Sequence, residues 1–166
     1  MPQITDPMPA LESFQKFFRE EKPAVQPGTL DPEVFLFVDQ VEEGKMRFAY
    51  FRHKRRTVTA FVMLVPADPY EGEHCVQLGW AVPPEYRGQG RAKELVAAAL
   101  AEFKNGIARS GITTFYVEAI VGADNGPSQR VAAATISNSP SKVTDKASGL
   151  PALQYLGKIG TDADEP

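Results

Sequence analysis

The stretch Arg87-Gly88-Gln89-Gly90-Arg91 combines cations with glycines between a strand-like apolar run and a helix-like run. The first turn of a helix has unpaired backbone N–H groups and carries the positive end of the helix dipole. Because glycine has no Cβ, Gly88 and Gly90 would let an anion approach those N–H groups, and the arginines add formal charge. This combination predicts a socket for a phosphate or pyrophosphate group.

An ordinary turn between a strand and a helix, with solvated arginines, would use the same residue types. Two known phosphate loops do not fit the stretch. The Gly-Lys-Ser/Thr ending of a P-loop is absent, and so is a Gly-x-Gly-x-x-Gly that opens a first strand–helix unit. The motif alone therefore leaves both a phosphate site and a plain turn open.

The hydrophobic periodicity indicates which elements would position this stretch. A helix is predicted over 10–21, with Leu11, Phe14, Phe17 and Phe18 on one face, and a turn-rich loop over 23–32. Strand patterns follow at 33–41, 45–53, 56–65 and 73–82. The short turns EEGK and HKRR between the first three strands predict an antiparallel meander.

The second half of the chain has a different pattern. A long helix is expected over 90–105, because its apolar residues fall on one stripe. A strand over 112–121, a short helix over 127–135 capped by Asn125, and two weak strands around Ser148-Gly149 complete the order. This order predicts a mixed α/β fold with at least one β-α-β crossover. We expect one domain over 1–166, with flexible tails at 1–9 and 160–166.

The segment VQLGWAVPPEYRGQGRAKELVAAALAEF resembles the central motif of the GNAT superfamily, the acyl-CoA-dependent N-acyltransferases. The signature Gln/Arg-x-x-Gly-x-Gly/Ala corresponds to Arg87 through Ala92, and AVPPEYRG is similar to the end of the family's preceding strand. ADNGPSQRVAAA resembles the family's second conserved region, and the likeness covers about residues 73–135. It implies a mostly antiparallel central sheet with two strands, here 73–82 and 112–121, splayed around a cofactor cleft and helices on both faces.

The resemblance also implies which residues would bind acetyl-CoA. Backbone groups of Ala81 and Val82 would hold the pantetheine arm and the acyl carbonyl. The pyrophosphate would lie on the backbone amides of 88–93, and Asn125 would contact the pantetheine arm with Ser128 close by. The full set implied for the cofactor is Ala81, Val82, Arg87, Gly88, Gln89, Gly90, Arg91, Ala92, Lys93, Asn125 and Ser128.

Transfer to an amine needs a base, since a free amine is largely protonated near neutral pH. His74, on the strand before the motif, is the candidate base, with Glu73 beside it, although a surface histidine would give the same pattern. The family's usual acid, a Tyr, is replaced here by Val131 and Ala132, so water would protonate the leaving thiolate, or Tyr155 or Tyr116 would do so. Cys75 is interpreted as a small buried hydrophobe, because the family commonly transfers the acyl group directly.

Two charged segments remain. RHKRR (52–56) is either a solvated hairpin tip, a contact for the 3′-phosphate of coenzyme A or a contact for an acidic macromolecule. DPYEGE (68–73) is acidic and would attract a cationic amine, so Tyr70 and Glu71 are candidates for binding the substrate.

Composition narrows the remaining classes of protein. The net charge of −3 makes nucleic acid an unlikely partner, and no apolar run is long enough to span a bilayer. One cysteine excludes an internal disulfide and a cysteine-rich zinc site, so no metal is expected, and the cytoplasm is the expected location.

The sequence therefore predicts an N-acetyltransferase that moves the acetyl group of acetyl-CoA to a primary amine by direct attack. The amine would belong to a small molecule, a protein N-terminus or a lysine, and a homodimer is compatible with the resemblance. The alternative is a non-catalytic acyl-CoA sensor or partner-binding module on the same fold. A nucleic-acid-binding domain that uses RHKRR is the third class.

Overall fold

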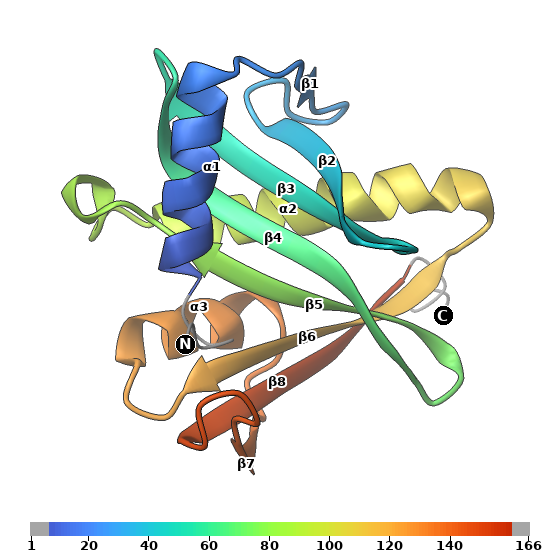
Figure 1. Ribbon diagram of the computed structural model, residues 1–166. Helices are drawn as coiled ribbons and strands as arrows, with labels where there is room; N and C mark the ends of the chain where they lie inside the picture. Colours follow the sequence, from blue (N-terminus) through green and yellow to red (C-terminus); the bar gives the residue numbers. More distant parts are fainter. Residues whose placement is uncertain (1–6, 161–166) are drawn as a thin grey trace.

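The computed structural model describes residues 7–160, in which eight strands form one sheet in the order β1-β2-β3-β4-β5-β6-β8-β7 (Figure 1). The strands are β1 (Gln26–Pro27), β2 (Phe35–Glu42), β3 (Lys45–Lys54), β4 (Thr57–Tyr70), β5 (Glu73–Ala81), β6 (Thr114–Gly122), β7 (Ser141–Thr144) and β8 (Pro151–Gly160). The α-helices are α1 (Met8–Glu20), α2 (Arg91–Ile107) and α3 (Gly126–Thr135), with short 3₁₀ turns at Pro84–Tyr86 and Ala108–Ser110.

The topology confirms the predicted fold class. β2 to β5 form the antiparallel meander, and β5 pairs in parallel with β6 after the chain crosses over through α2. One hydrophobic cluster packs α2 and α3 against the sheet, and a second packs α1 against β3 and β4 on the opposite face (Figure 1). The sheet therefore has helices on both faces, and the parallel pair of β5 with β6 joins its two antiparallel halves.

Helix α1 begins two residues earlier than the sequence pattern indicated. It starts at Met8, so the prediction of a loose segment over 1–9 is wrong at Met8 and Pro9. Proline is compatible with the first turn of a helix, because the N–H that it lacks has no partner there. The remaining parts of the two predicted tails, residues 1–6 and 161–166, lie outside the described residues, and Gly160 ends β8.

The predicted loop over 23–32 contains the short strand β1 and a contact to α2 that the sequence did not indicate. Glu102 of α2 is only 7% exposed. Its carboxylate accepts hydrogen bonds from the backbone N–H groups of Thr29, Leu30 and Asp31, at 2.9, 2.9 and 2.7 Å. This carboxylate therefore anchors the loop to the helix whose first turn carries the glycine motif.

Strand β4 runs five residues beyond its predicted end, through Pro66 and Pro69 to Tyr70. Its described pairs with β3 stop at Leu64, so the proline segment pairs with β5 alone. Because an edge position does not require a second ladder of hydrogen bonds, proline is tolerated there. The acidic segment 68–73 is consequently the tip of a long β4–β5 hairpin.

Candidate active site

Strands β5 and β6 separate partway along their length. Their ladder holds three described pairs, from Cys75 with Tyr116 to Gln77 with Glu118. Beyond these pairs β5 continues beside β4 as far as Ala81, and β6 continues beside β8 as far as Gly122. The two halves of the sheet therefore diverge, as the sequence resemblance implied.

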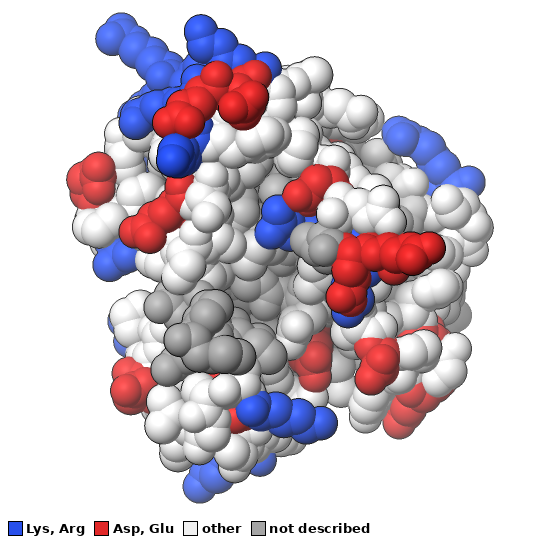
Figure 2. Space-filling model, viewed as in Figure 1, with Lys and Arg blue, Asp and Glu red and all other residues white. Residues whose placement is uncertain are grey.

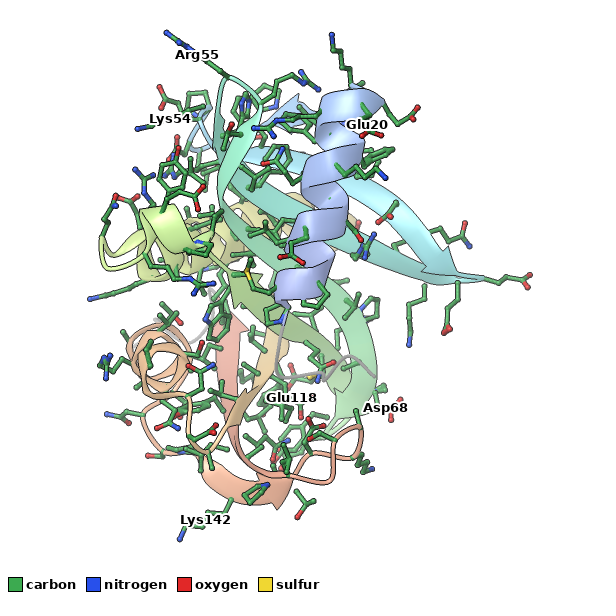
Figure 3. All side chains as sticks on the ribbon, turned by 60° about the vertical axis from the view of Figure 1, so that its left-hand side comes forward. Glu20, Lys54, Arg55, Asp68, Glu118 and Lys142 are labelled. Carbon is green, nitrogen blue, oxygen red and sulfur yellow. The ribbon has the colours of Figure 1, made fainter. Side chains whose placement is uncertain are left out.

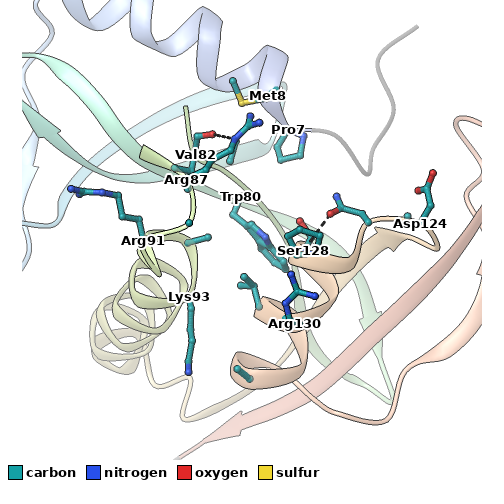
Figure 4. A pocket seen from close by; sticks show the side chains of 18 of the residues that line it. Pro7, Met8, Trp80, Val82, Arg87, Arg91, Lys93, Asp124, Ser128 and Arg130 are labelled. Atoms are coloured by element: carbon teal, nitrogen blue, oxygen red, sulfur yellow. Dashed lines mark hydrogen bonds between the residues drawn. The ribbon is translucent and has the colours of Figure 1, made fainter. Parts of the chain in front are cut away.

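A cavity of about 1180 Å³ opens where these strands diverge (Figure 4). Its lining includes Trp80, Ala81 and Val82 from β5, and Gly122 to Asn125 after β6. The start of α2, one side of α3, and Pro7 and Met8 at the start of α1 also line it, as do Asp145, Ser148, Leu150 and Pro151. The volume exceeds that of typical sites for drug-sized ligands, which leaves room for a large cofactor.

The first turn of α2 faces this cavity without a side-chain cap. Gly90 is the N-cap residue, in the left-handed conformation at φ 74°, and Gly88 has the same φ. A Cβ on either glycine would meet no protein atom within 4 Å. The positive φ favours glycine at both positions. The lack of a side chain there also leaves open space for a ligand. The N–H groups of the turn are consequently available to an anion.

Three cationic side chains from different elements line the cavity. Arg87 donates from Nε to the carbonyl of Val82 at 2.8 Å, which fixes it at the end of β5 (Figure 4). Lys93 extends from α2 and Arg130 from α3 (Figure 4). A fourth cation, Arg91, also borders the cavity and lies over the ring of Tyr86, with 5.0 Å from its Cζ to the ring centroid. Positive charge and exposed N–H groups together favour a polyphosphate ligand.

The structure brings ten of the eleven predicted cofactor residues to this cavity, namely Ala81, Val82, Arg87, Gly88, Gly90, Arg91, Ala92, Lys93, Asn125 and Ser128. Gln89 is not among the lining residues, and its amide oxygen accepts a hydrogen bond from Arg91 at 3.1 Å. Asn125 caps α3 by accepting a hydrogen bond from the backbone N–H of Ser128 at 3.2 Å (Figure 4). The predicted cap is confirmed, while the contacts of these residues with a ligand stay predictions.

The four residues predicted for catalysis and substrate binding lie elsewhere, at the far end of β5. Strands rise about 3.4 Å per residue, so exposed His74 is roughly 24 Å from Ala81 at the end of β5. Glu73 accepts a hydrogen bond from Thr114 Oγ1 at 2.7 Å and pairs with Lys158 at 3.0 Å. Tyr70 packs edge-on against Tyr116, and Glu71 is in the hairpin turn. None of the four lines either cavity found among residues 7–160.

The bonds of Glu73 indicate a structural contact. The hydrogen bond from Thr114, followed by the interaction with Lys158, holds the pKa of the Glu73 carboxyl below its usual value. A carboxylate stabilised in its charged form is a weaker base. Neither the placement nor the pKa of Glu73 supports a role in proton transfer.

A carboxylate that the sequence reading did not single out lies at the point where β5 and β6 separate. Glu118 pairs with Gln77 in the last described pair, so their side chains share the sheet face toward α1. Its side chain is half-buried in the middle of that face (Figure 3) and accepts a hydrogen bond from Gln154 Nε2. One feature of the sequence could have identified Glu118. It is an acid at the centre of a strand whose alternate residues, from Phe115 to Val121, are buried and apolar.

Cys75 is buried, as expected. Burial and then the negative charge of Glu118 raise the pKa of its thiol. A thiol with a raised pKa is a poor nucleophile, which agrees with direct transfer.

Most of the basic segment RHKRR is used in packing. Arg52 pairs with Asp31 at 2.9 Å. His53 packs against Phe18 and accepts a hydrogen bond from the backbone N–H of Arg56, whose guanidinium also lies over the Phe18 ring. Only Lys54 and Arg55 extend freely into solvent, at the hairpin tip (Figure 3). Acidic residues accompany the cations at this end of the molecule (Figure 2), which does not resemble a continuous basic surface.

Comparisons with known proteins agree with this geometry. The profile of the acetyltransferase (GNAT) family matches residues 11–134. The chain therefore belongs to this family, which confirms the resemblance inferred from the sequence. The enzyme class and the acetyl-CoA co-substrate expected from the sequence are those of the family. No curated protein sequence matches the chain.

Comparison with solved structures finds the same fold in a protein of low sequence identity. The ribosomal-protein-S5-alanine acetyltransferase from Vibrio fischeri is 14% identical with a TM-score of 0.50, covering 71% of this chain and 63% of that enzyme. This chain therefore spans less than two thirds of the length of that relative. The acetyltransferase yncA from Salmonella typhimurium, solved with acetyl-CoA, is 15% identical with a TM-score of 0.47, over 70% of this chain and 65% of that one.

Two further observations concern metal ions and membranes. In the part of the chain from 7 to 160, no three His, Cys, Asp or Glu side chains are grouped as metal ligands. No helix in that part is long and apolar enough to cross a membrane.

Proposed function

We propose that the protein transfers the acetyl group of acetyl-CoA to a primary amine by direct attack. The observation that carries this proposal is the uncapped first turn of α2, which opens into the cavity between diverging β5 and β6. The residues present fit the co-substrate. The N–H groups of the turn and the cations Arg87, Lys93 and Arg130 suit phosphates, and the separated strands leave room for an extended arm.

Acetyl-CoA supplies a thioester as the acyl donor. In the transfer the amine nitrogen forms a C–N bond, the C–S bond breaks, one amine proton goes to a base, and the thiolate takes a proton from water. Main-chain groups of β5 beyond Gln77 have no described partner on β6, so those N–H groups that point away from β4 are available to a developing oxyanion.

Glu118 is the base that the geometry favours. It lies at the apex of the cleft, on the sheet face toward α1, and the amide of Gln154 orients it. Neither Glu118 nor the alternative candidate His74 is among the residues that line the cavity. Glu118 is in the last β5–β6 pair, where the strands separate, whereas His74 lies before the first pair at the other end of the ladder. A base must come within hydrogen-bond reach of the amine, directly or through a water molecule.

Thioester consumption with a panel of primary amines tests these assignments. We expect Glu118→Gln to reduce kcat by about 10²-fold or more while acetyl-CoA affinity is retained. The matched variant His74→Ala should retain the wild-type rate. Loss of activity in His74→Ala together with full activity in Glu118→Gln would reverse the assignment.

The non-catalytic acyl-CoA sensor makes a different prediction in the same assay. It would bind acetyl-CoA and consume no thioester with any amine.

A homodimer and a cytoplasmic location also stay predictions of the proposal. Sedimentation and cell fractionation measure them directly.

A further inference from the structure

A second cavity, of about 740 Å³, lies on the face of the sheet that α1 covers. Its lining comes from α1 and from β2, β3, β4 and β5. None of the residues predicted from the sequence for cofactor or substrate belongs to it. Its use therefore has to be argued from the structure alone, and the argument rests on the acetyl transfer proposed above.

The register of the sheet defines the floor of this cavity. Gly79 of β5 pairs with Met63 of β4, Met63 with Ala49 of β3, and Ala49 with Phe37 of β2. All four residues line the cavity. Neighbouring strands lie about 4.8 Å apart, so this row spans about 14 Å across the strands. The floor is therefore an elongated apolar track that starts at β5.

The wall of the cavity is also apolar. Phe14 and Phe17 of α1 approach Phe37, with ring centroids 6.0 and 5.2 Å from it. The polar side chains in the lining are Ser13, Gln77, Asp39 and Arg47. Such a lining favours an aliphatic or aromatic ligand with few polar groups.

The second cavity meets the first at β5. Pro7 lines both cavities, and the consecutive residues Gly79 and Trp80 line one each. A Cβ on Gly79 would touch Pro7 and Met63, at 3.5 and 3.6 Å, so a side chain larger than methyl would fill the junction. The β5 end of the track is therefore next to the cleft apex, where Glu118 shares the sheet face.

The other end of the track is polar. Arg47 Nε and Nη2 donate to the two carboxylate oxygens of Asp39, at 3.1 and 2.7 Å. Both side chains are about one third exposed, at 32% and 31%. The described bonds use two of the five N–H groups of the guanidinium, so others can donate to a ligand. This end therefore favours a hydrogen-bond acceptor such as a carboxylate.

We propose that this cavity holds the acceptor, a primary amine with an apolar body and a carboxylate or similar acceptor group at its other end. The amine would lie at β5 and the carboxylate at Arg47. An extended peptide fits less well, because its backbone N–H and C=O groups need partners. The strand backbones in the floor already use theirs in the ladders.

The test measures the rate of acetylation of five amines at saturating acetyl-CoA. Two are aminohexanoate and aminodecanoate, each with an amine at one end and a carboxylate at the other. The other three are decylamine, spermidine and a tetrapeptide with a free N-terminus. We expect KM to fall by up to about fourfold for each CH₂ group that becomes buried. Aminodecanoate should have a lower KM than aminohexanoate, spermidine and the tetrapeptide.

The variant Arg47→Gln tests the polar end of the track. It should raise KM for aminodecanoate by about tenfold or more and leave KM for decylamine within about twofold. The double variant Asp39→Asn with Arg47→Gln avoids an unpaired carboxylate and should behave in the same way. Lys45→Gln is the matched control, because it removes the exposed Lys45–Glu42 pair on the same hairpin, outside the cavity, and should leave both KM values unchanged.

The outcomes separate this inference from the proposed function. Acetylation with no dependence of KM on chain length, or with spermidine or the tetrapeptide preferred, would overturn the assignment of the cavity and leave acetyl transfer in place. An equal rise of KM for decylamine and aminodecanoate in Arg47→Gln would remove the role of Arg47. Failure to bind acetyl-CoA or to acetylate any amine would overturn the proposed function itself.

Discussion

Removing the carboxylate of Glu102 should destabilise the protein far more than removing an exposed acid from the same helix. The Glu102 carboxylate accepts three backbone hydrogen bonds of 2.7–2.9 Å and is nearly inaccessible to water. At about 1 kcal/mol for each bond lost, Glu102→Ala should lower the free energy of unfolding by about 3 kcal/mol. For a chain of this size, that corresponds to a Tm lower by about 6–12 °C.

Urea denaturation monitored by circular dichroism measures this effect. Glu94→Ala is the matched control on α2. The Glu94 side chain is 70% exposed, and its one described interaction is a long ion pair of 3.8 Å with Arg52 Nε. This substitution should therefore change the free energy of unfolding by less than about 0.5 kcal/mol. A loss below about 1 kcal/mol in Glu102→Ala would mean that water satisfies the loop equally well. The anchoring of residues 28–31 to α2 would then contribute little.

A double-mutant cycle tests the same contact from the other side. A Cβ on Gly28 would lie 2.5 Å from both Glu102 Oε2 and the carbonyl oxygen of Asp31. Gly28→Ala should therefore displace the loop from Glu102. Because both substitutions disrupt one contact, the double variant should lose less stability than the sum of the single variants, by about 0.5–3 kcal/mol. Strict additivity would contradict the contact.

Three further predictions follow from single groups. Burial, and then the charge of Arg56, lower the pKa of His53, so the folded state favours its neutral form. Stability should therefore fall as the pH decreases below about 6.5, and urea midpoints at several pH values should show a weaker fall in His53→Gln; an equal fall in both proteins would contradict this contribution. Asn125→Ala removes the cap of α3 and should cost about 1 kcal/mol in urea denaturation, whereas Asn125→Asp should retain most of it; equal losses would contradict capping. The pKa of Glu73 is lowered in the folded state, so the stability that it contributes is present above the ordinary carboxyl pKa and is lost as the pH falls through the folded-state value. In the same measurement, Glu73→Gln should lose less stability at acid pH than the wild type. An equal loss in both proteins would exclude this contribution.

The sequence predicted well those features that depend on local pattern. The short turns between the first strand patterns identified the meander, and the stripe from Ala92 to Phe103 identified α2 with its buried face. The glycine motif also located the uncapped start of that helix, where Gly88 and Gly90 both have a positive φ, while phosphate binding at this turn stays a prediction. These features are set by residues close together in the chain.

The features that it missed depend on distant segments. Strand β4 continues through Pro66 because β3 has stopped pairing, which no local pattern reveals. His74 was expected near the chemistry because it shares β5 with Ala81, but the length of the strand separates them. Glu118 became a candidate only because the register places it in the last pair before β5 and β6 separate. Arg47 became one only because it lines the second cavity.

Calorimetric titration with acetyl-CoA of the wild type, Gly90→Glu and Gly111→Glu tests the central claim most directly. Gly90 and Gly111 have similar positive φ values, 74° and 83°, near opposite ends of α2, and a Cβ on either would meet no atom within 4 Å. The backbone strain is therefore matched, while only Gly90 borders the cavity. The account predicts that the wild type and Gly111→Glu bind acetyl-CoA with equal affinity and that Gly90→Glu loses at least about 10²-fold, because it places a carboxylate at the phosphate site. Equal affinity in all three proteins would contradict the claim that the first turn of α2 binds the diphosphate.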